Sequence, residues 1–249
     1  DNSSIVIWTT TPWTIPCNKA IAYSKELNYK IVEVHENLDS LSLKKGEKIL
    51  IAENLITNFC DFHSLKNYKI KGEVEKSNFE KFVCNHPLKR IGYNFNVQLF
   101  QGDHVTDETG TGFVHIAPNH GIEDFEVGQQ NKLDNLPTVN ESGIYTKNIP
   151  YFNGEHVYKA DEKVVNELKK TSNLISCSDY NHSYPHSWRS KAPLIFRATS
   201  QWFISLQSKN LRQKALDEIE KVEWIPKSSK NRISSMIKDR PDWCISRQR

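Results

Sequence analysis

Two stretches of the sequence hold most of the residues that could take part in chemistry. The first, residues 8–16, reads WTTTPWTIP and contains four threonines between and beside two prolines. Because a residue that precedes proline is disfavoured in the helical region, we expect Thr11 and Ile15 to be extended. Threonine is stiff at its first side-chain torsion, so its hydroxyls would be pre-positioned donors and acceptors. The alternative is a threonine-rich strand end whose hydroxyls cap the local backbone.

The second stretch, residues 110–129, reads GTGFVHIAPNHGIEDFEVGQ. Its apolar run from Phe113 to Ala117 predicts a buried strand that contains one polar ring, His115. The residues from Pro118 to Gly121 then turn the chain, and a helix should begin near Ile122. On sequence alone, His115 is either a site residue or a core histidine whose ring nitrogens bond the backbone.

Three acidic residues, Glu123, Asp124 and Glu126, lie in the first turns of that helix. The helix dipole favours negative charge there, so all three are explained if they are simply solvated. A sharper hypothesis is that the short side chain of Asp124 turns back over the strand end towards His115, where it could hold a cation.

The remaining pattern predicts strands that alternate with amphipathic helices, and hence a core of mixed character. We expect strands at 4–9, 20–23, 29–34, 48–52 and 97–105, and helices at 53–65, 161–174, 211–222 and 229–238. Residues 77–80, SNFE, fit a capping box before a further short helix.

Composition excludes several classes of protein. No apolar run approaches the ~20 residues of a membrane span, and no glycine-rich phosphate loop is present. Five widely spaced cysteines without a C-x-x-C pair favour a reducing cytoplasm. Serines at 187 and 190, where a knuckle would need cysteines, argue against zinc. The chain starts at Asp1 and its single methionine is Met236, so we expect a fragment of a longer protein.

The net charge of +3 does not by itself require nucleic acid, but residues 225–249 hold seven basic and two acidic residues. Such a segment either attracts a phosphate backbone or is a solvated basic helix face.

Four motifs together resemble the isoleucyl-tRNA synthetase family. They are WTTTPWTIP, GTGFVHIAPNHGIEDFEVGQ, HSYPHSWRSKAPLIFRATSQWF and RPDWCISRQR, and they span nearly the whole chain in the family's order. The related valyl and leucyl enzymes typically have threonine-threonine-arginine-proline in the first motif, whereas this chain has Pro12-Trp13 after its threonines. The HIGH and KMSKS signatures of the ATP site are absent. The match is therefore to the editing insertion and the segment that returns to the catalytic domain.

The resemblance implies an α+β fold, with a β-rich, barrel-like editing domain of the valyl, leucyl and isoleucyl type and peripheral helices. We expect the editing core at 1–178 and the return segment at 179–249. The fragment should need no cofactor or metal, since ATP and magnesium belong to the catalytic domain of the parent. We further expect a cytoplasmic monomer that contacts the rest of the synthetase and no membrane.

The implied activity is hydrolysis, by a positioned water, of the ester that joins wrongly attached valine to isoleucine tRNA. By the same resemblance, Asp124 binds the amino group of the substrate, and His115 limits the size of its side chain. The threonines contact the terminal adenosine, the ester and the water, and Asn18 matches a nearby asparagine. The catalytic set is thus Thr9, Thr10, Thr11 and Asp124, and the substrate-binding set is Thr14, Asn18 and His115.

Two other functions stay open on sequence. One is a module that binds the tRNA acceptor end but has lost hydrolysis, and it predicts RNA affinity without turnover. The other is an editing domain of the valyl branch, which predicts cleavage of a threonyl ester, and Pro12-Trp13 argues against it.

Overall fold

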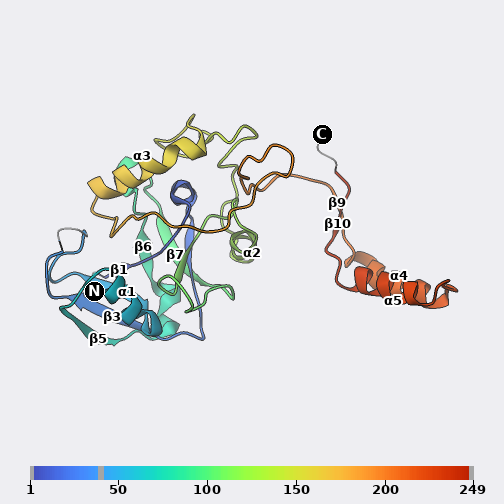
Figure 1. Cartoon of the computed structure of the whole chain (residues 1–249), viewed down its shortest axis with the longest axis horizontal. Helices are drawn as coiled ribbons and strands as arrows, with labels where there is room; N and C mark the ends of the chain where they lie inside the picture. The colour runs from blue at the N-terminus through green and yellow to red at the C-terminus, as the bar shows by residue number, and fades with distance from the viewer. Residues whose placement is uncertain (1–2, 39–41, 247–249) are drawn as a thin grey trace. The chain divides into compact units, whose positions relative to one another are not determined.

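The computed structural model describes residues 3–38 and 42–246, which fall into two compact units, Asp1–Ala198 and Thr199–Arg249. The first unit contains two four-stranded sheets (Figure 1). One sheet has the order β1 (Ser4–Ile5), β4 (Lys48–Ala52), β3 (Tyr29–Val34) and β5 (Tyr68–Glu73). The other has the order β6 (Val83–Asn85), β7 (Asn96–Gln101), β2 (Ala20–Tyr23) and β8 (Phe113–Ile116).

Both sheets are mixed. β1 runs parallel to β4 and β2 runs parallel to β7, while the other neighbours are antiparallel. The fold is therefore α+β, as predicted, because the helices lie beside mixed and largely antiparallel sheets. The described strands do not close into one barrel.

The helices of the first unit are peripheral and mostly short. The α-helices are α1 (Ile56–Phe62), α2 (Ile122–Gln130) and α3 (Val157–Lys170). The 3-10 helices are η1 (Pro12–Cys17), η2 (Glu53–Leu55), η3 (Lys76–Lys81) and η4 (Lys89–Ile91). In Figure 1, α1 lies beside β3 and β5, whereas α3 lies at the opposite end of this unit.

Three apolar clusters hold the first unit together. The largest joins the two sheets through buried aromatic rings, among them Tyr29, which lies 4.5 Å from Phe113 between ring centroids. A second cluster packs α3 against η1 through Trp13 and Ile15. The third places Val127 of α2 over the small side chains of β2. The two elements that carry the site motifs, η1 and β8, are therefore fixed by separate parts of the core.

The second unit is a strand pair followed by a helical hairpin. β9 (Phe203–Ile204) pairs with β10 (Trp243–Cys244), and η5 (Ser208–Asn210) leads into α4 (Leu211–Lys221), which packs against α5 (Ser228–Lys238). The guanidinium of Arg212 donates to the carbonyl of Ile237 at 2.6 Å and so joins the two helices. Throughout the described chain, every helix is too short or too polar to cross a bilayer.

Several predicted elements have the predicted bounds. Strands β2, β3 and β4 agree residue for residue, and α2, α4 and α5 begin at or within one residue of the predicted starts. Other elements differ. The strand predicted at 4–9 ends at Ile5, the one at 97–105 spans Asn96–Gln101, and the helix at 161–174 spans Val157–Lys170.

Local interactions explain three further corrections. Ile15 is not extended but lies inside η1, since its carbonyl accepts from the backbone N–H of Asn18 and its side chain is buried. The predicted capping box is wrong, because η3 begins after Glu75 without a side-chain cap. The helix predicted at 53–65 is split into η2 and α1, and Phe62 on it is 71% exposed.

The first compact unit extends to Ala198, beyond the predicted domain boundary between 178 and 179. Its last residues belong to it because the backbone N–H of Ala198 donates to the carbonyl of Asn119 at 2.8 Å. The division at 178 between an editing core and a return segment stays a prediction about function.

Candidate functional site

The threonine-rich stretch forms a hydrogen-bonded turn at the start of η1. The backbone N–H of Thr11 donates to Oγ1 of Thr9 at 3.1 Å, and the two hydroxyl oxygens lie 3.2 Å apart. The hydroxyl of Thr14 donates to the carbonyl of Thr11 at 2.8 Å. These are local side-chain to backbone bonds, as the alternative interpretation expected. They also hold the hydroxyls of Thr9 and Thr11 side by side in a partly buried position.

His115 is joined to this turn from β8. Its Nε2 lies 3.1 Å from Oγ1 of Thr14, and its ring is buried. Since the hydroxyl proton of Thr14 is directed to the carbonyl of Thr11, Nε2 must donate and Nδ1 must be unprotonated. Nδ1 is buried and has no hydrogen-bond partner among the described residues. The ring nitrogens are therefore not satisfied by backbone, contrary to the core-histidine interpretation.

Burial keeps the His115 ring neutral. Desolvation, and to a smaller extent the nearby His120, lower the pKa of His115 to about 4. A buried imidazole that is neutral at physiological pH keeps one ring nitrogen unprotonated, and in His115 that nitrogen is Nδ1.

Asp124 lies in the first turn of α2 and turns its carboxylate back to the end of β8. Oδ2 accepts from the backbone N–H of Ala117 at 2.8 Å, two residues beyond His115. Burial raises the pKa of Asp124 to about 6, and the bond from Ala117 opposes part of that rise. The second oxygen, Oδ1, makes no hydrogen bond to the described residues. A cationic group placed beside it would relieve the cost of burying the charge.

The other two predicted residues differ in their surroundings. Asn18 is buried, and its side-chain oxygen accepts from the backbone N–H of Ile116 at 3.2 Å, so it ties the end of η1 to β8. Thr10 is partly exposed, and within the described chain its hydroxyl forms no hydrogen bond. The structure thus joins Thr9, Thr11, Thr14 and His115 in one network, with Asn18 and Asp124 on the same strand end.

Sequence reasoning missed a second histidine beside this network. His120 Nδ1 lies 2.9 Å from the carbonyl of Phe196, and its Nε2 lies 2.8 Å from Oγ1 of Thr138. A carbonyl can only accept, so Nδ1 carries the proton and Nε2 accepts from Thr138. Burial lowers the pKa of His120 to about 4, and its ring packs edge-on against Trp13 at 4.9 Å. Its partners are far away in the sequence, so no local pattern marks it.

A half-buried acid that supports η1 was also missed. Oδ1 of Asp161, in α3, accepts from the backbone N–H of Trp13 at 2.8 Å. The hydroxyl of Tyr145 donates to the carbonyl of Trp13. The first backbone N–H groups of a helix lack an intrahelical acceptor, and Asp161 supplies one from another element. No local sequence pattern signals a contact over such a separation.

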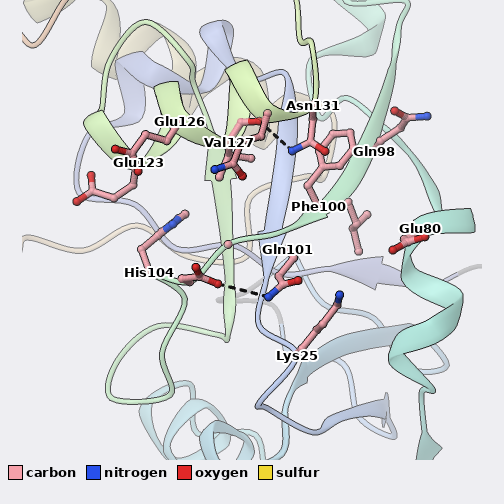
Figure 2. Close-up of a pocket in the computed structure, with 14 residues that line it drawn as sticks. Lys25, Glu80, Gln98, Phe100, Gln101, His104, Glu123, Glu126, Val127 and Asn131 are labelled. Carbon is pink, nitrogen blue, oxygen red and sulfur yellow. Dashed lines mark hydrogen bonds between the residues drawn. The ribbon is translucent and has the colours of Figure 1, made fainter. Parts of the chain in front are cut away.

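A polar groove of about 790 Å³ lies on the other face of the second sheet. Figure 2 shows Glu123 and Glu126 of α2 at one side, and Lys25 and Glu80 across from them. Val127 lines this groove and belongs to the α2 cluster with Ile116, whereas His115 points to the opposite face of β8. The predicted site residues do not line this groove.

Polar groups from two distant segments of the chain gather at the end of β8. They include hydroxyl groups from Thr9 and Thr11 and a carboxylate oxygen on Asp124, while the unpaired Nδ1 of His115 is buried within the protein. The network contains hydroxyls and one neutral imidazole, which are groups that donate and accept hydrogen bonds.

Comparison with known proteins defines the class. The family model for class I tRNA synthetases (I, L, M and V) matches residues 8–249, so the chain belongs to this family. In fold, the chain is like the crystal structure of GlLeuRS-CP1, with a TM-score of 0.53 at 14% identity over 71% of this chain and 84% of that one.

Relatives that match all or nearly all of the chain include isoleucine–tRNA ligases, which confirms the resemblance indicated by the motifs. The chain is 44% identical to the ligase of Pelagibacter ubique over all of its own length and 27% of that protein. It is 44% identical to that of Idiomarina loihiensis and 46% identical to that of Colwellia psychrerythraea, each over 25% of the relative. The chain thus spans about a quarter of the length of these relatives.

Proposed function

We propose that this chain is the editing part of an isoleucyl-tRNA synthetase and hydrolyses the ester of valine wrongly attached to isoleucine tRNA. The observation that supports it most is the meeting of two motifs at the end of β8, where Thr14 bonds His115 and Asp124 bonds the backbone of Ala117. The physical need is plain, because one methylene in an apolar pocket gives only ~1–3 kcal/mol of discrimination, a general magnitude for which this same enzyme family is the standard example.

In this proposal Asp124 binds the α-ammonium of the aminoacyl group. A carboxylate paired with an ammonium is held by a charge-assisted hydrogen bond, which is stronger than a neutral one. Oδ1 is the oxygen for this bond, since Oδ2 is already held by Ala117. The bond from Ala117 fixes the orientation of the carboxylate before the substrate arrives.

Thr9, Thr10 and Thr11 hold the terminal adenosine, the ester and the attacking water. A water positioned against the ester carbonyl needs an acceptor and a donor in fixed places, and the paired hydroxyls of Thr9 and Thr11 offer both. Thr14, Asn18 and His115 complete the pocket. Isoleucine is excluded in this account because His115, fixed by Thr14, occupies the space that its extra methylene would need.

The parent synthetase attaches isoleucine to its tRNA with ATP in a separate catalytic domain, and the whole works in the cytoplasm. The fragment itself acts as a monomer, uses no metal or cofactor, and meets the acceptor end of the tRNA.

Removing the carboxylate is the most direct test of the residue assignment. Asp124→Asn keeps the size of the side chain and an oxygen that can accept from Ala117, so the fold should survive while deacylation falls by about 10- to 150-fold, the scale of one lost charge-assisted hydrogen bond. Glu123→Gln is the matched control, because Glu123 is an exposed neighbour in the same helical turn. Unchanged deacylation by a folded Asp124→Asn protein would contradict the assignment.

A further inference from the structure

A row of aromatic rings extends from the threonine network along the segment that leads to Ala198. We call it the aromatic ladder, and its members are Trp8, Tyr180, His182, Tyr184 and His186. Neighbouring rings in the ladder lie 5.2 to 6.1 Å apart between centroids, beginning with Trp8 and Tyr180 in an edge-to-face contact. Every second residue from 180 to 186 thus contributes one ring.

The start of the ladder is open to solvent. Trp8 is 45% exposed and Tyr180 is 57% exposed, and His182 beside them is exposed as well. The far end is anchored, because the hydroxyl of Tyr184 donates to the carbonyl of Leu194 at 2.9 Å. Contiguous exposed rings on a supported segment mark an interaction surface rather than a core.

The position of the aromatic ladder and the charge around it indicate which kind of molecule binds there. Trp8 directly precedes Thr9, whose hydroxyl belongs to the threonine network, so the ladder begins where the ester of the substrate would lie. The segment 179–198 contains three basic residues, Arg189, Lys191 and Arg197, and one acidic residue. Flat exposed rings with excess positive charge nearby are what an unpaired nucleic acid strand requires, because every base has a face that stacks and every link is a phosphate.

We propose that Trp8 and Tyr180 form a stacking platform for the unpaired bases at the 3′ end of an RNA. This inference rests on the proposed function, because it assumes that the ester is presented to Thr9 on such an end. Stacking on the platform would orient the strand so that its terminal nucleotide enters the threonine network. It would be tolerant of base identity, since stacking reads ring faces and not hydrogen-bonding edges.

Binding of RNA without any ester tests the platform separately from hydrolysis. The probe is a hairpin RNA with a short unpaired 3′ end, and the comparison is the same hairpin with a blunt end. For the whole 249-residue chain we expect tighter binding of the probe with the unpaired end. Trp8→Ala and Tyr180→Ala should each weaken that binding about 5- to 150-fold and leave the blunt hairpin unaffected.

Two control variants make the outcome specific. Tyr180→Phe keeps the ring and should bind as the unaltered chain does, and Phe62→Ala removes a ring that is 71% exposed on α1, outside the ladder. Equal affinity of Trp8→Ala, Tyr180→Ala and the unaltered chain would overturn the platform, as would an equal loss in Phe62→Ala. If either of these binding results is found while the chain still deacylates its substrate, only the stacking platform is refuted and the proposed function stands. Stacking of the unpaired end by a chain that hydrolyses no ester would refute the proposed function alone.

Discussion

Burial changes the ionisation of the acid and the histidines around β8 in opposite senses, and both changes favour the uncharged form. The pKa of Asp124 is raised to about 6, whereas those of His115 and His120 are lowered to about 4. At neutral pH the carboxylate is ionised and both rings are neutral. The site therefore presents one negative charge among neutral donors and acceptors, which suits a substrate with one ammonium group.

The raised pKa of Asp124 predicts a pH profile. Only the ionised carboxylate pairs with an ammonium, so deacylation should fall about tenfold for each pH unit below about 6. The same shift means that the folded chain binds this proton more tightly than the unfolded chain. The Asp124 contribution to stability therefore falls as pH rises from about 4 to about 6, opposite to the change in activity.

The measurement is the protein-dependent rate of deacylation between pH 5 and 8. Asp124→Asn should lack the step near pH 6 and be slow throughout. A flat profile in the unaltered chain would show that ionisation of Asp124 does not control the reaction.

At the scale of elements, η1 is positioned by contacts that the sequence does not reveal. The acid of α3 supplies the acceptor for the N–H of Trp13, and the pKa of Asp161 is raised by its burial. Asp161→Ala would leave that N–H without its acceptor, at a cost of about 1–3 kcal/mol in the free energy of unfolding. Asp161→Asn retains an oxygen and should cost less, and Glu162→Ala, at an exposed neighbour, should cost little.

Urea unfolding of these three variants measures the difference. If Asp161→Ala unfolds at the same midpoint as Glu162→Ala, the bond to Trp13 does not stabilise η1. Loss of deacylation in Asp161→Ala alone would further show that the position of η1 matters to the site.

The elements that were predicted most accurately are those with strong local sequence patterns. The apolar runs of β2, β3 and β4 defined those strands to the residue, and the periodic helices α4 and α5 were nearly as close. β5 was missed because its residues, Tyr68–Glu73, are largely exposed and charged, so its pairing with β3 is not visible in its own pattern. Ile15 was predicted to be extended from its proline neighbour, but the burial of Ile15 and Trp13 decided the conformation.

The site was predictable only as far as its motifs were contiguous. Thr9, Thr11, Thr14 and His115 do meet, and the carboxylate of Asp124 does turn back to the strand end. His120 with Thr138 and Phe196 was not predicted, because tertiary contact alone joins three distant segments.

At the scale of the whole first unit, the two sheets meet where β8 begins. Gly112 has a φ of +78°, and a Cβ there would lie 2.3 Å from Cβ of Ala52 at the end of β4. The carbonyl of Thr111 accepts from the backbone N–H of Ala52, so the strands cannot separate easily. This junction allows β8 to carry His115 to the threonine turn.

Gly112→Ala should destabilise the fold in two ways, through strain in the backbone and through a steric clash. The positive φ costs about 1–2 kcal/mol, and the clash with Ala52 adds about 1–3 kcal/mol. Gly154→Ala is the matched control, since Gly154 has a φ of +84° and open space around its Cβ position. Equal midpoints of thermal unfolding for the two variants would show that the close approach to Ala52 is relieved without cost.

Editing by the whole chain is tested most directly with charged tRNA. The measurement is the deacylation rate of isoleucine tRNA that carries either valine or isoleucine, with the 249-residue chain at high concentration. The account predicts rapid loss of the valyl ester and persistence of the isoleucyl ester. Equal loss of both esters, or loss of neither when the chain is also joined to the rest of its synthetase, would contradict it.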